Sequence, residues 1–222
     1  MLGLMSLMGA LIAMSLLYVV GMGYVRRVNR RFFARGIACK GDTMKVLLLS
    51  GGLDSALILH RFKSLIDLCV SVDYGQPHIA ELHHAQALAE EYGVRWQRVT
   101  IAGLYGPTSS GMFRGDVDNP EDTVIPARNA LLISIAAAAG ANVVFIGCNK
   151  DDHDVYPDCR LKFLKDIDET LGVTVMAPLL VMTKKEVVRA AKDEGLDISK
   201  TLTCYRGTRC GECAACALLL LL

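Results

Sequence analysis

The sequence predicts an α/β fold in which helices flank a doubly wound, mostly parallel sheet. Short apolar runs alternate with segments of helical periodicity along residues 44–200, and a glycine-rich turn joins the first run to the first helix. Polar clusters then follow the apolar runs, where ligands of such sheets bind. With 222 residues, of which 52% are hydrophobic, the chain is long enough for one large domain and a small appendage.

Each element follows from the spacing of the apolar residues. Residues 46–49 form an apolar run typical of a buried strand, and the residues from Ala56 onward form the first amphipathic helix. Thr183 and Glu186 have the spacing of a capping box at the start of the last main helix. Four glycines and three prolines within residues 103–126 indicate a long loop. Further strands are expected at 67–72, 95–101, 142–147 and 173–177, and further helices at 80–92, 128–139, 160–171 and 183–195.

The glycine-rich turn has the sequence Ser50-Gly51-Gly52-Leu53-Asp54-Ser55 and directly follows Leu49. Paired glycines let backbone amides approach an anion closely, and the N-terminus of the following helix adds a partial positive charge. The turn lacks the Gly-Lys-Ser/Thr end of a Walker loop, so a P-loop NTPase is disfavoured. The pattern instead resembles the pyrophosphate loop of ATP pyrophosphatases, and this resemblance implies activation of a substrate by adenylation.

Three polar clusters follow the expected second strand, the long loop and the expected fourth strand. The carboxyl ends of parallel strands meet at one edge of a sheet, so we expect these clusters to lie beside the glycine turn. Each cluster alone is also what an ordinary loop contains. The clusters are Asp73-Tyr74-Gly75-Gln76, Pro126-Ala127-Arg128-Asn129, and residues 147–160, which include Gly147, Asp151, Asp152 and Tyr156-Pro157-Asp158-Cys159-Arg160.

Residues 1–43 differ in composition from the rest of the chain. Residues 2–25 carry no charge, and five arginines follow within residues 26–35. A stretch of this length can span a bilayer as a helix, with the basic cluster on the cytoplasmic side. Met44 would also serve as a start, so a membrane anchor and a start codon assigned too early are competing interpretations. Without residues 1–43 the chain has 18 basic and 22 acidic residues, which indicates no basic surface for nucleic acid.

Four cysteines near the C-terminus are spaced as C-x5-C-x2-C-x2-C. Four thiolates at this spacing can surround one tetrahedral zinc ion and leave no open position, which makes the site structural. Disulfides are the alternative, but an ATP-using enzyme belongs in a reducing compartment, where such clusters are more often metal sites. Cys159 is expected in a pocket wall rather than as a nucleophile. The reducing compartment predicted for the catalytic part is the cytoplasm. The predicted zinc ligands are Cys204, Cys210, Cys213 and Cys216.

The chain is therefore expected to have three parts. An apolar and basic extension covers residues 1–43, a nucleotide-binding catalytic domain covers 44–200, and a zinc-binding module covers 201–222. The apolar residues 217–222 fit a buried last helix, an oligomer contact or a truncated end.

Six motifs in residues 44–216 resemble those of the QueC family of 7-cyano-7-deazaguanine synthases, within the ATP pyrophosphatase (PP-loop) superfamily. They are residues 50–55, Asp73-Tyr74-Gly75-Gln76, Pro126-x-Arg128-Asn129, residues 156–160, Thr201-Leu202-Thr203-Cys204-Tyr205 and Cys210-Gly211-x-Cys213-x-x-Cys216. The resemblance implies an adenine nucleotide alpha hydrolase-like fold, a homodimer, and the use of ATP, magnesium and structural zinc. It also implies conversion of 7-carboxy-7-deazaguanine and ammonia to the nitrile, through an adenylate and an amide, in queuosine-type biosynthesis.

The implied chemistry assigns roles to individual residues. Asp54 would bind magnesium, because a carboxylate beside phosphates requires a cation. Arg128 and Arg160 are candidates for the substrate carboxylate or the phosphates, which suit a guanidinium fork. Lys184 would either neutralise charge in the departing pyrophosphate or be a solvated lysine in the first turn of a helix. Predicted catalytic residues are Asp54, Ser55, Arg128, Arg160 and Lys184; nucleotide-binding residues are Leu49, Ser50, Gly51, Gly52, Leu53, Asp54, Ser55, Asp73 and Gly147; and substrate-binding residues are Tyr74, Gln76, Asn129, Tyr156 and Asp158.

The chain departs from the family pattern at Pro77, where a basic residue is usual, in a shorter loop before Pro126, and in a tail without the arginine often found after Cys216.

Three alternative functions therefore remain. Another ATP pyrophosphatase, such as a tRNA thiolase or an amidating synthetase, is one, although a thiolase needs a reactive cysteine near the loop and a basic RNA surface. A QueC-like enzyme recruited to DNA or protein modification is the second. The third is a tethered nucleotide-binding module without turnover, which the presence of Asp54 and both arginines disfavours.

Overall fold

The computed structural model describes residues 43–106, 110–213 and 216. These residues belong to one compact unit, Thr43–Leu222. Residues 1–42 of the expected extension (1–43), with its candidate membrane span at 2–25, and the apolar tail at 217–222 lie outside the described residues. Within the described part of the chain, no helix has the length and apolar character needed to cross a bilayer.

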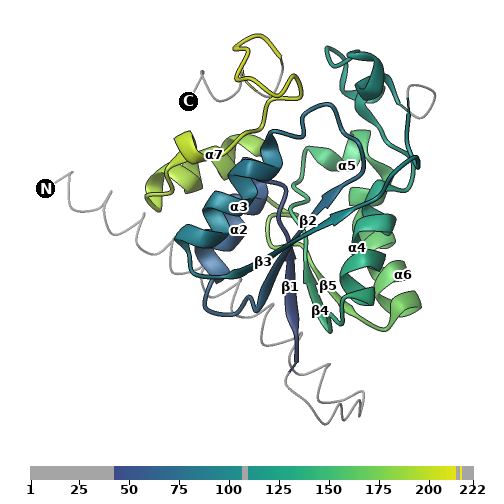
Figure 1. Cartoon of the computed structure of the whole chain (residues 1–222), viewed down its shortest axis with the longest axis vertical. Coiled ribbons are helices and arrows are strands. Elements are labelled where there is room, and N and C mark those ends of the chain that lie inside the picture. Colours follow the sequence, from purple (N-terminus) through teal and green to yellow (C-terminus); the bar gives the residue numbers. More distant parts are fainter. Residues whose placement is uncertain (1–42, 107–109, 214–215, 217–222) are drawn as a thin grey trace, which may run out of the picture. The chain divides into compact units, whose positions relative to one another are not determined.

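Five parallel strands form a central sheet, which confirms the predicted doubly wound α/β fold (Figure 1). The strand order is β3-β2-β1-β4-β5, so the chain builds outward from β1 to β3 and then crosses back to add β4 and β5 on the other side. All four pairings are parallel, where the sequence predicts a mostly parallel sheet. The strands are β1 (Lys45–Leu48), β2 (Leu68–Asp73), β3 (Arg95–Thr100), β4 (Val143–Phe145) and β5 (Thr174–Met176).

The helices form a layer on each face of this sheet (Figure 1). On one face lie α2 (Leu53–Phe62), α3 (Glu81–Glu91) and α7 (Lys184–Asp193), and on the other lie α4 (Arg128–Ala138) and α6 (Leu161–Leu171). Because both faces are covered, β2 is buried along its whole length and β4 is buried at every residue. The edge strand β3 has no fully buried residue.

Local sequence signals explain how several helices begin and end. The predicted capping box of α7 is confirmed, because the Thr183 hydroxyl accepts from the Glu186 N–H and the Glu186 carboxylate accepts from the Thr183 N–H. Gly172 ends α6 in the left-handed region, at φ 66°.

Single-turn elements are the part of the fold that the sequence pattern misses. The expected loop over residues 103–126 contains the 3₁₀ helices η1 (Gly111–Arg114) and η2 (Pro120–Thr123). The polar stretch after β4 contains α5 (Asp152–Val155) and η3 (Pro157–Cys159), and η4 (Ile198–Lys200) precedes the cysteine segment. One turn is too short to show a helical period, so periodicity cannot identify these elements.

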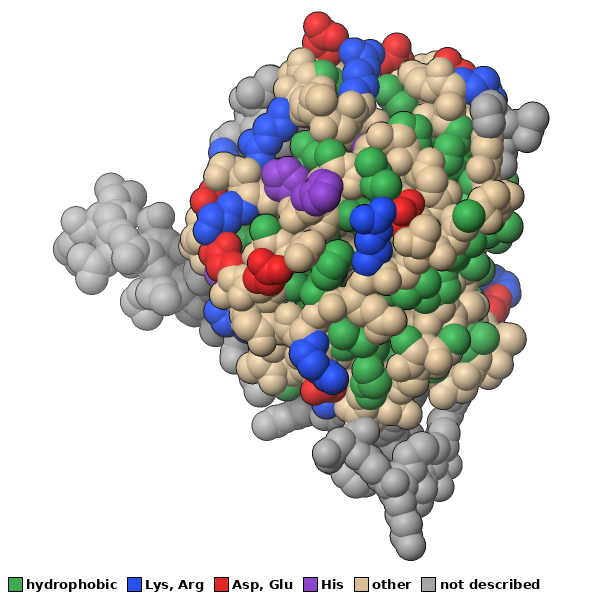
Figure 2. Space-filling model, viewed as in Figure 1, with side chains coloured by type: hydrophobic (Ala, Val, Ile, Leu, Met, Phe, Trp, Pro, Cys, Tyr) green, Lys and Arg blue, Asp and Glu red, His purple; other side chains and the backbone are tan. Residues whose placement is uncertain are grey.

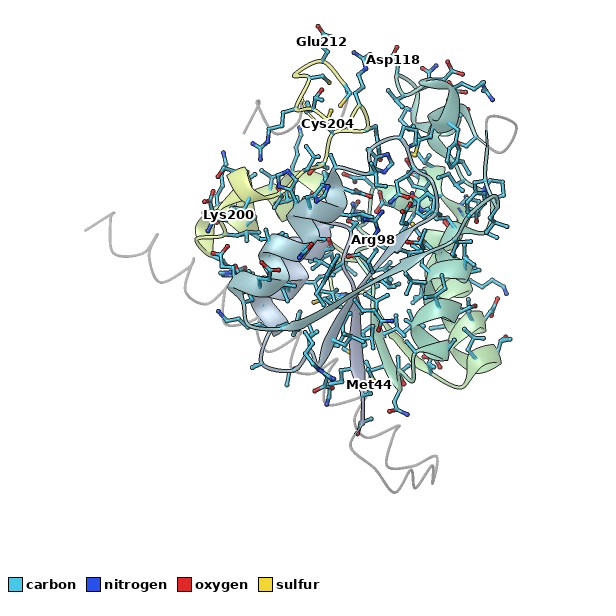
Figure 3. All side chains as sticks on the ribbon, in the orientation of Figure 1. Met44, Arg98, Asp118, Lys200, Cys204 and Glu212 are labelled. Atoms are coloured by element: carbon cyan, nitrogen blue, oxygen red, sulfur yellow. The ribbon has the colours of Figure 1, made fainter. Side chains whose placement is uncertain are left out.

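Figure 3 locates the two ends of the sheet. Met44 lies at the end where β1 begins, whereas Arg98 lies towards the carboxyl ends of the strands, on the side of Cys204.

On the face shown in Figure 2, Lys and Arg side chains lie singly or beside Asp and Glu side chains. Ion pairs among the described residues include Arg61 with Glu194 and Lys200 with Glu91.

Candidate functional site

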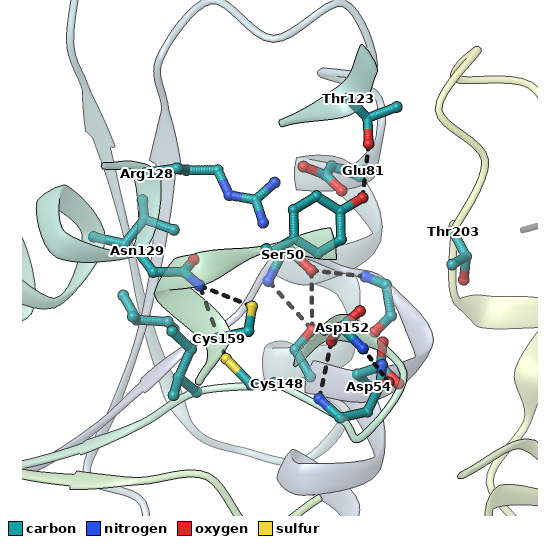
Figure 4. A pocket seen from close by; sticks show the side chains of 18 of the residues that line it. Ser50, Asp54, Glu81, Thr123, Arg128, Asn129, Cys148, Asp152, Cys159 and Thr203 are labelled. Atoms are coloured by element: carbon teal, nitrogen blue, oxygen red, sulfur yellow. Dashed lines mark hydrogen bonds between the residues drawn. The ribbon is translucent and has the colours of Figure 1, made fainter. Parts of the chain in front are cut away.

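A pocket of about 450 Å³ lies beyond the carboxyl ends of β1 and β4, where the strand order reverses. Ligands of doubly wound sheets bind at this position. Its wall includes most of the predicted site residues, namely Leu49, Ser50, Gly52, Asp54, Ser55, Tyr74, Arg128, Asn129, Gly147, Tyr156 and Lys184 (Figure 4). The predicted residues Gly51, Leu53, Asp73, Gln76, Asp158 and Arg160 lie outside this wall.

Two serine hydroxyls form hydrogen bonds within the glycine turn, which leads into the N-terminus of α2. The hydroxyls of Ser50 and Ser55 lie 3.2 Å apart, and the Ser50 hydroxyl accepts from the Gly52 N–H at 3.2 Å. Gly52 is the N-cap of α2, and its position supplies no capping side chain. Two hydroxyls and the N-terminal end of α2 therefore lie at the pocket wall, and these are features of an anion site.

Gly51 is the residue of the turn that packs against α3. Its φ of +90° is in the left-handed region, and a Cβ placed on it would lie 2.1 Å from the Glu81 carbonyl oxygen and 2.9 Å from the Ala85 nitrogen. No side chain fits there unless backbone moves. The Gly51 carbonyl also accepts a hydrogen bond from the Leu202 N–H at 2.9 Å, so the turn is held from two sides.

Gly51→Ala is expected to lower the free energy of unfolding by about 3 kcal/mol, because it adds both backbone strain and a clash with α3. Gly52→Ala is the matched control, because a Cβ there would lie 3.3 Å from the side-chain oxygen of Ser50 rather than against backbone, and φ is −76°. Urea unfolding of the two variants measures the difference. Equal stability of the two variants would contradict this packing of the turn against α3.

Asp54 and Lys184 form an ion pair in the pocket, although they are far apart in the sequence. Lys184 Nζ pairs with Asp54 Oδ2, while Asp54 Oδ1 is buried and has no hydrogen-bond partner among the described residues. Asp152 accepts from the Asn149 N–H at 2.9 Å, and burial raises the pKa of its carboxyl group. Asp151 accepts from the backbone N–H of Lys184. The unpaired oxygen of Asp54 is the buried carboxylate atom of this group that has no partner among the described residues, and a carboxylate oxygen is the ligand type that a hard cation such as Mg²⁺ prefers.

Arg128 contributes a guanidinium group to the wall of the pocket. It is the first residue of α4 and follows Ala127, whose φ of 55° turns the chain sharply into the helix. Its guanidinium carbon lies 5.8 Å from the centroid of the Tyr156 ring, and the group forms no ion pair with a carboxylate among the described residues. Burial raises the pKa of the neighbouring Tyr74 to about 12, so that hydroxyl is neutral. The guanidinium is therefore available to a planar oxyanion.

Asp158 and Arg160 are occupied by the protein's own backbone. Asp158 Oδ2 accepts from the Asn129 N–H at 2.8 Å and so caps the start of α4. Arg160 is exposed, and its Nε donates to the His153 carbonyl oxygen at 2.9 Å. The predicted contact of Asp158 with the substrate, and that of Arg160 with an oxyanion, stay predictions for which this arrangement offers no support.

Gln76 and Asp73 also face inward. The Gln76 side chain accepts from the Tyr74 N–H at 2.9 Å and donates to the Val72 carbonyl oxygen at 3.2 Å, so it closes the turn after β2. Asp73 pairs with Arg98 at 2.5 Å, and this hydrogen bond lowers the pKa of the Asp73 carboxyl group. Both side chains support the pocket from behind its wall.

Asn129 connects α4 to two thiols in the pocket wall. Its Nδ2 lies 3.3 Å from Cys159 Sγ and 3.8 Å from Cys148 Sγ, and it donates to the Asp158 carbonyl oxygen at 3.2 Å (Figure 4). Hydrogen bonding to Cys159, together with burial, raises the pKa of Cys148 well above its ordinary value. Cys159 is buried in the wall, as expected from the sequence.

Sequence reasoning missed His78 and Glu81 as site residues. Both line the pocket, from the turn that precedes α3 and from its first residue. His78 and Glu81 come shortly after the Asp73-Tyr74-Gly75-Gln76 motif and are three residues apart. A histidine and a carboxylate at this spacing, next to a predicted site motif, were the sequence signal that could have identified them. Tyr205, from the segment before the last three cysteines, also lines the pocket and meets the His78 ring edge to face.

The four C-terminal cysteines converge. One sulfur from each of Cys204, Cys210, Cys213 and Cys216 lies within 4.8 Å of the others, and all but Cys210 are buried. Although burial opposes it, hydrogen bonds from the backbone N–H groups of Cys210 and Thr208 lower the pKa of Cys204 to about 6, whereas burial raises the pKa of Cys213 and of Cys216. The convergence of four sulfur ligands makes the cluster compatible with a metal ion.

Three comparisons place the chain among known proteins. A family model described as "Queuosine biosynthesis protein QueC" matches residues 44–220. A 7-cyano-7-deazaguanine synthase from Ectopseudomonas mendocina is 35% identical over 80% of this chain and 92% of the relative. A second, from Pseudomonas putida, is 36% identical over 78% of this chain and 90% of the relative. Among solved structures, an NH3-dependent NAD synthetase from Campylobacter jejuni aligns with a TM-score of 0.43 at 19% identity, over 72% of this chain and 69% of the other.

The family match covers the glycine turn, the pocket and the cysteine cluster together. The two relatives are matched over nearly their whole length at more than a third identity. The chain therefore belongs to the QueC family of queuosine biosynthesis proteins.

Proposed function

We propose that this chain converts 7-carboxy-7-deazaguanine, ATP and ammonia to 7-cyano-7-deazaguanine, AMP and pyrophosphate. As a QueC family member it is an ATP-dependent ligase of queuosine biosynthesis. The observation that supports the detailed reaction is one pocket lined both by residues of the glycine turn and by a guanidinium that has no carboxylate partner among the described residues. The turn suits the phosphates of ATP, and Arg128 suits a carboxylate.

The glycine turn and the residues around Asp54 would hold the nucleotide. Backbone N–H groups and the hydroxyls of Ser50 and Ser55 receive the β and γ phosphates as a leaving group. Asp54 would hold Mg²⁺, with Asp152 nearby, and the ion would supply charge neutralisation for the departing pyrophosphate. Lys184, paired with Asp54, adds a further positive charge beside the same phosphates.

The substrate must lose both carboxylate oxygens to become a nitrile. A carboxylate is a poor electrophile, so its oxygen first attacks the α-phosphorus of ATP, and pyrophosphate leaves. Ammonia then displaces AMP to give the primary amide. The amide oxygen is activated by a second ATP in the same way, and loss of AMP leaves the nitrile. Arg128 orients the oxyanion towards the turn in the first activation.

The products of a turnover assay test this proposal. Purified chain with ATP, MgCl₂, ammonium chloride and 7-carboxy-7-deazaguanine is expected to release AMP and pyrophosphate, with one ATP consumed for each oxygen atom removed. Mass spectrometry should show the primary amide before the nitrile. Substrate-dependent release of ADP and orthophosphate without AMP would rule out adenylation, and a product attached to protein or DNA would favour a recruited enzyme.

We also propose zinc as the ion at the cysteine cluster. A set of four sulfur ligands with no oxygen or nitrogen donor suits a closed, tetrahedral zinc site, whose contribution is to folding. The homodimer implied by the family resemblance stays a prediction, which sedimentation of the purified protein would test.

A further inference from the structure

Buried His78 and partly buried Glu81 form a pair in the pocket wall that the steps above do not use. His78 Nε2 lies 3.4 Å from Glu81 Oε1, and the two side chains are 7% and 12% exposed. Both line the pocket. An imidazole oriented by a carboxylate is a common arrangement for accepting a proton from a substrate.

The contact with Glu81 indicates which nitrogen of the His78 ring carries the proton and which has a lone pair. A carboxylate only accepts hydrogen bonds, so in the neutral ring Nε2 carries the proton and Nδ1 presents a lone pair. Nδ1 is buried and has no hydrogen-bond partner among the described residues. Leaving a buried acceptor unpaired is unfavourable, so this atom is suited to a donor on a ligand.

Several contacts hold the pair in place. The His78 ring meets the Tyr205 ring edge to face, with centroids 6.0 Å apart. Glu81 Oε1 also lies 3.5 Å from Gln76 Nε2, which is itself anchored to the backbone of β2. A rigid base needs such support, because its rotamer determines the direction of the lone pair.

The pair also lies against the glycine turn. The carbonyl oxygen of Glu81 is the atom that leaves no room for a side chain on Gly51. The start of α3 is therefore packed on the segment that would hold the nucleotide phosphates, and Glu81 and Arg128 are seen in the same view of the pocket (Figure 4). A base in this position lies on the wall of the chamber in which an adenylate would form.

We propose that His78, oriented by Glu81, accepts the protons that the nitrogen atom loses; this proposal rests on the function proposed above. In the amide step a C–N bond forms, the C–O bond to AMP breaks with its electron pair, and one ammonia proton passes to Nδ1. In the nitrile step the nitrogen loses one proton to Nδ1 as the amide oxygen becomes bonded to AMP, which leaves an imidate with a single N–H. The last N–H proton then passes to Nδ1, its electron pair becomes the third C–N bond, and the C–O bond to AMP breaks with its electron pair. Between these transfers the imidazolium gives up its proton. The imidazolium then returns its proton to solvent.

The test separates adenylation from the reaction with nitrogen. Substrate-dependent exchange of labelled pyrophosphate into ATP reports adenylation without ammonia. Hydroxylamine traps the acyl adenylate as a hydroxamate and is a strong nucleophile that depends little on a base. His78→Gln is expected to lower amide formation from ammonium chloride by about a hundredfold, while exchange and hydroxamate formation stay at wild-type rates. Glu81→Gln should reduce the same step by a smaller factor, because the ring remains but its orientation is less restricted.

His83→Gln is the matched control, since His83 lies in α3 two residues after Glu81, is exposed and does not line the pocket. It should behave as wild type in all three assays. Two results would overturn the assignment of His78 as the base and leave the proposed function standing. One is an equal loss of activity with ammonia and with hydroxylamine in both His78→Gln and Glu81→Gln. The other is full activity of His78→Gln with ammonia. No exchange in the wild-type protein would overturn the proposed function and this assignment with it.

Discussion

Asp54→Ala is expected to lower turnover by about a hundredfold or more while leaving the fold intact, because a lost electrostatic contact to the departing phosphates has this usual size. Asp54 Oδ1 is buried without a partner, and Oδ2 pairs with Lys184, so the residue is available to a cation and a lysine together. The measurements are the rate of AMP formation and the MgCl₂ concentration at half-maximal rate.

Two further variants define the cause of that loss. Asp54→Asn keeps the shape of the side chain and an acceptor for Lys184 but removes the charge, so it should be as impaired as Asp54→Ala and should require more MgCl₂. Asp166→Ala removes an exposed carboxylate whose partner Lys162 is also exposed, and it should change neither quantity. Normal turnover of Asp54→Asn would show that the charge of Asp54 is not needed.

Cys213→Ser is expected to lower the stability of the whole fold and to remove one zinc ion per chain. Cys213 is 1% exposed, and structural zinc sites contribute directly to folding. The effect should extend to activity, because the Leu202 N–H donates to the Gly51 carbonyl oxygen and the Leu53 N–H lies 3.4 Å from the Thr203 hydroxyl. The segment that leads into the cysteine cluster therefore supports the glycine turn.

Zinc content by mass spectrometry and the melting temperature measure this effect together. Cys69→Ala is the control, because Cys69 is buried in β2 away from the cluster, where burial raises its thiol pKa to about 12. This variant should lose some stability but keep its zinc. A wild-type protein that contains no zinc, yet folds and turns over normally, would refute the metal assignment.

Much of the fold is predictable because its signals are local. The alternation of apolar runs with helical periods identifies all five strands and the longer helices, and the capping box of Thr183 and Glu186 fixes one helix start. The four cysteines are close in sequence, so their spacing alone indicates that they can converge, as the structure confirms. The position of the pocket follows from the strand order, because only one edge of a parallel sheet gathers carboxyl ends.

Tertiary packing decided which polar side chains face the pocket. Local sequence patterns predict that Asp158, Gln76 and Arg128 lie in loops or at helix starts near the glycine turn. Only the three-dimensional packing turned the first two towards backbone groups and left the guanidinium of Arg128 in the pocket wall. It also brought Lys184 to Asp54 across 130 residues, and placed His78 beside Tyr205. Side-chain direction depends on which distant backbone donors and acceptors lie nearby, and no local pattern records that.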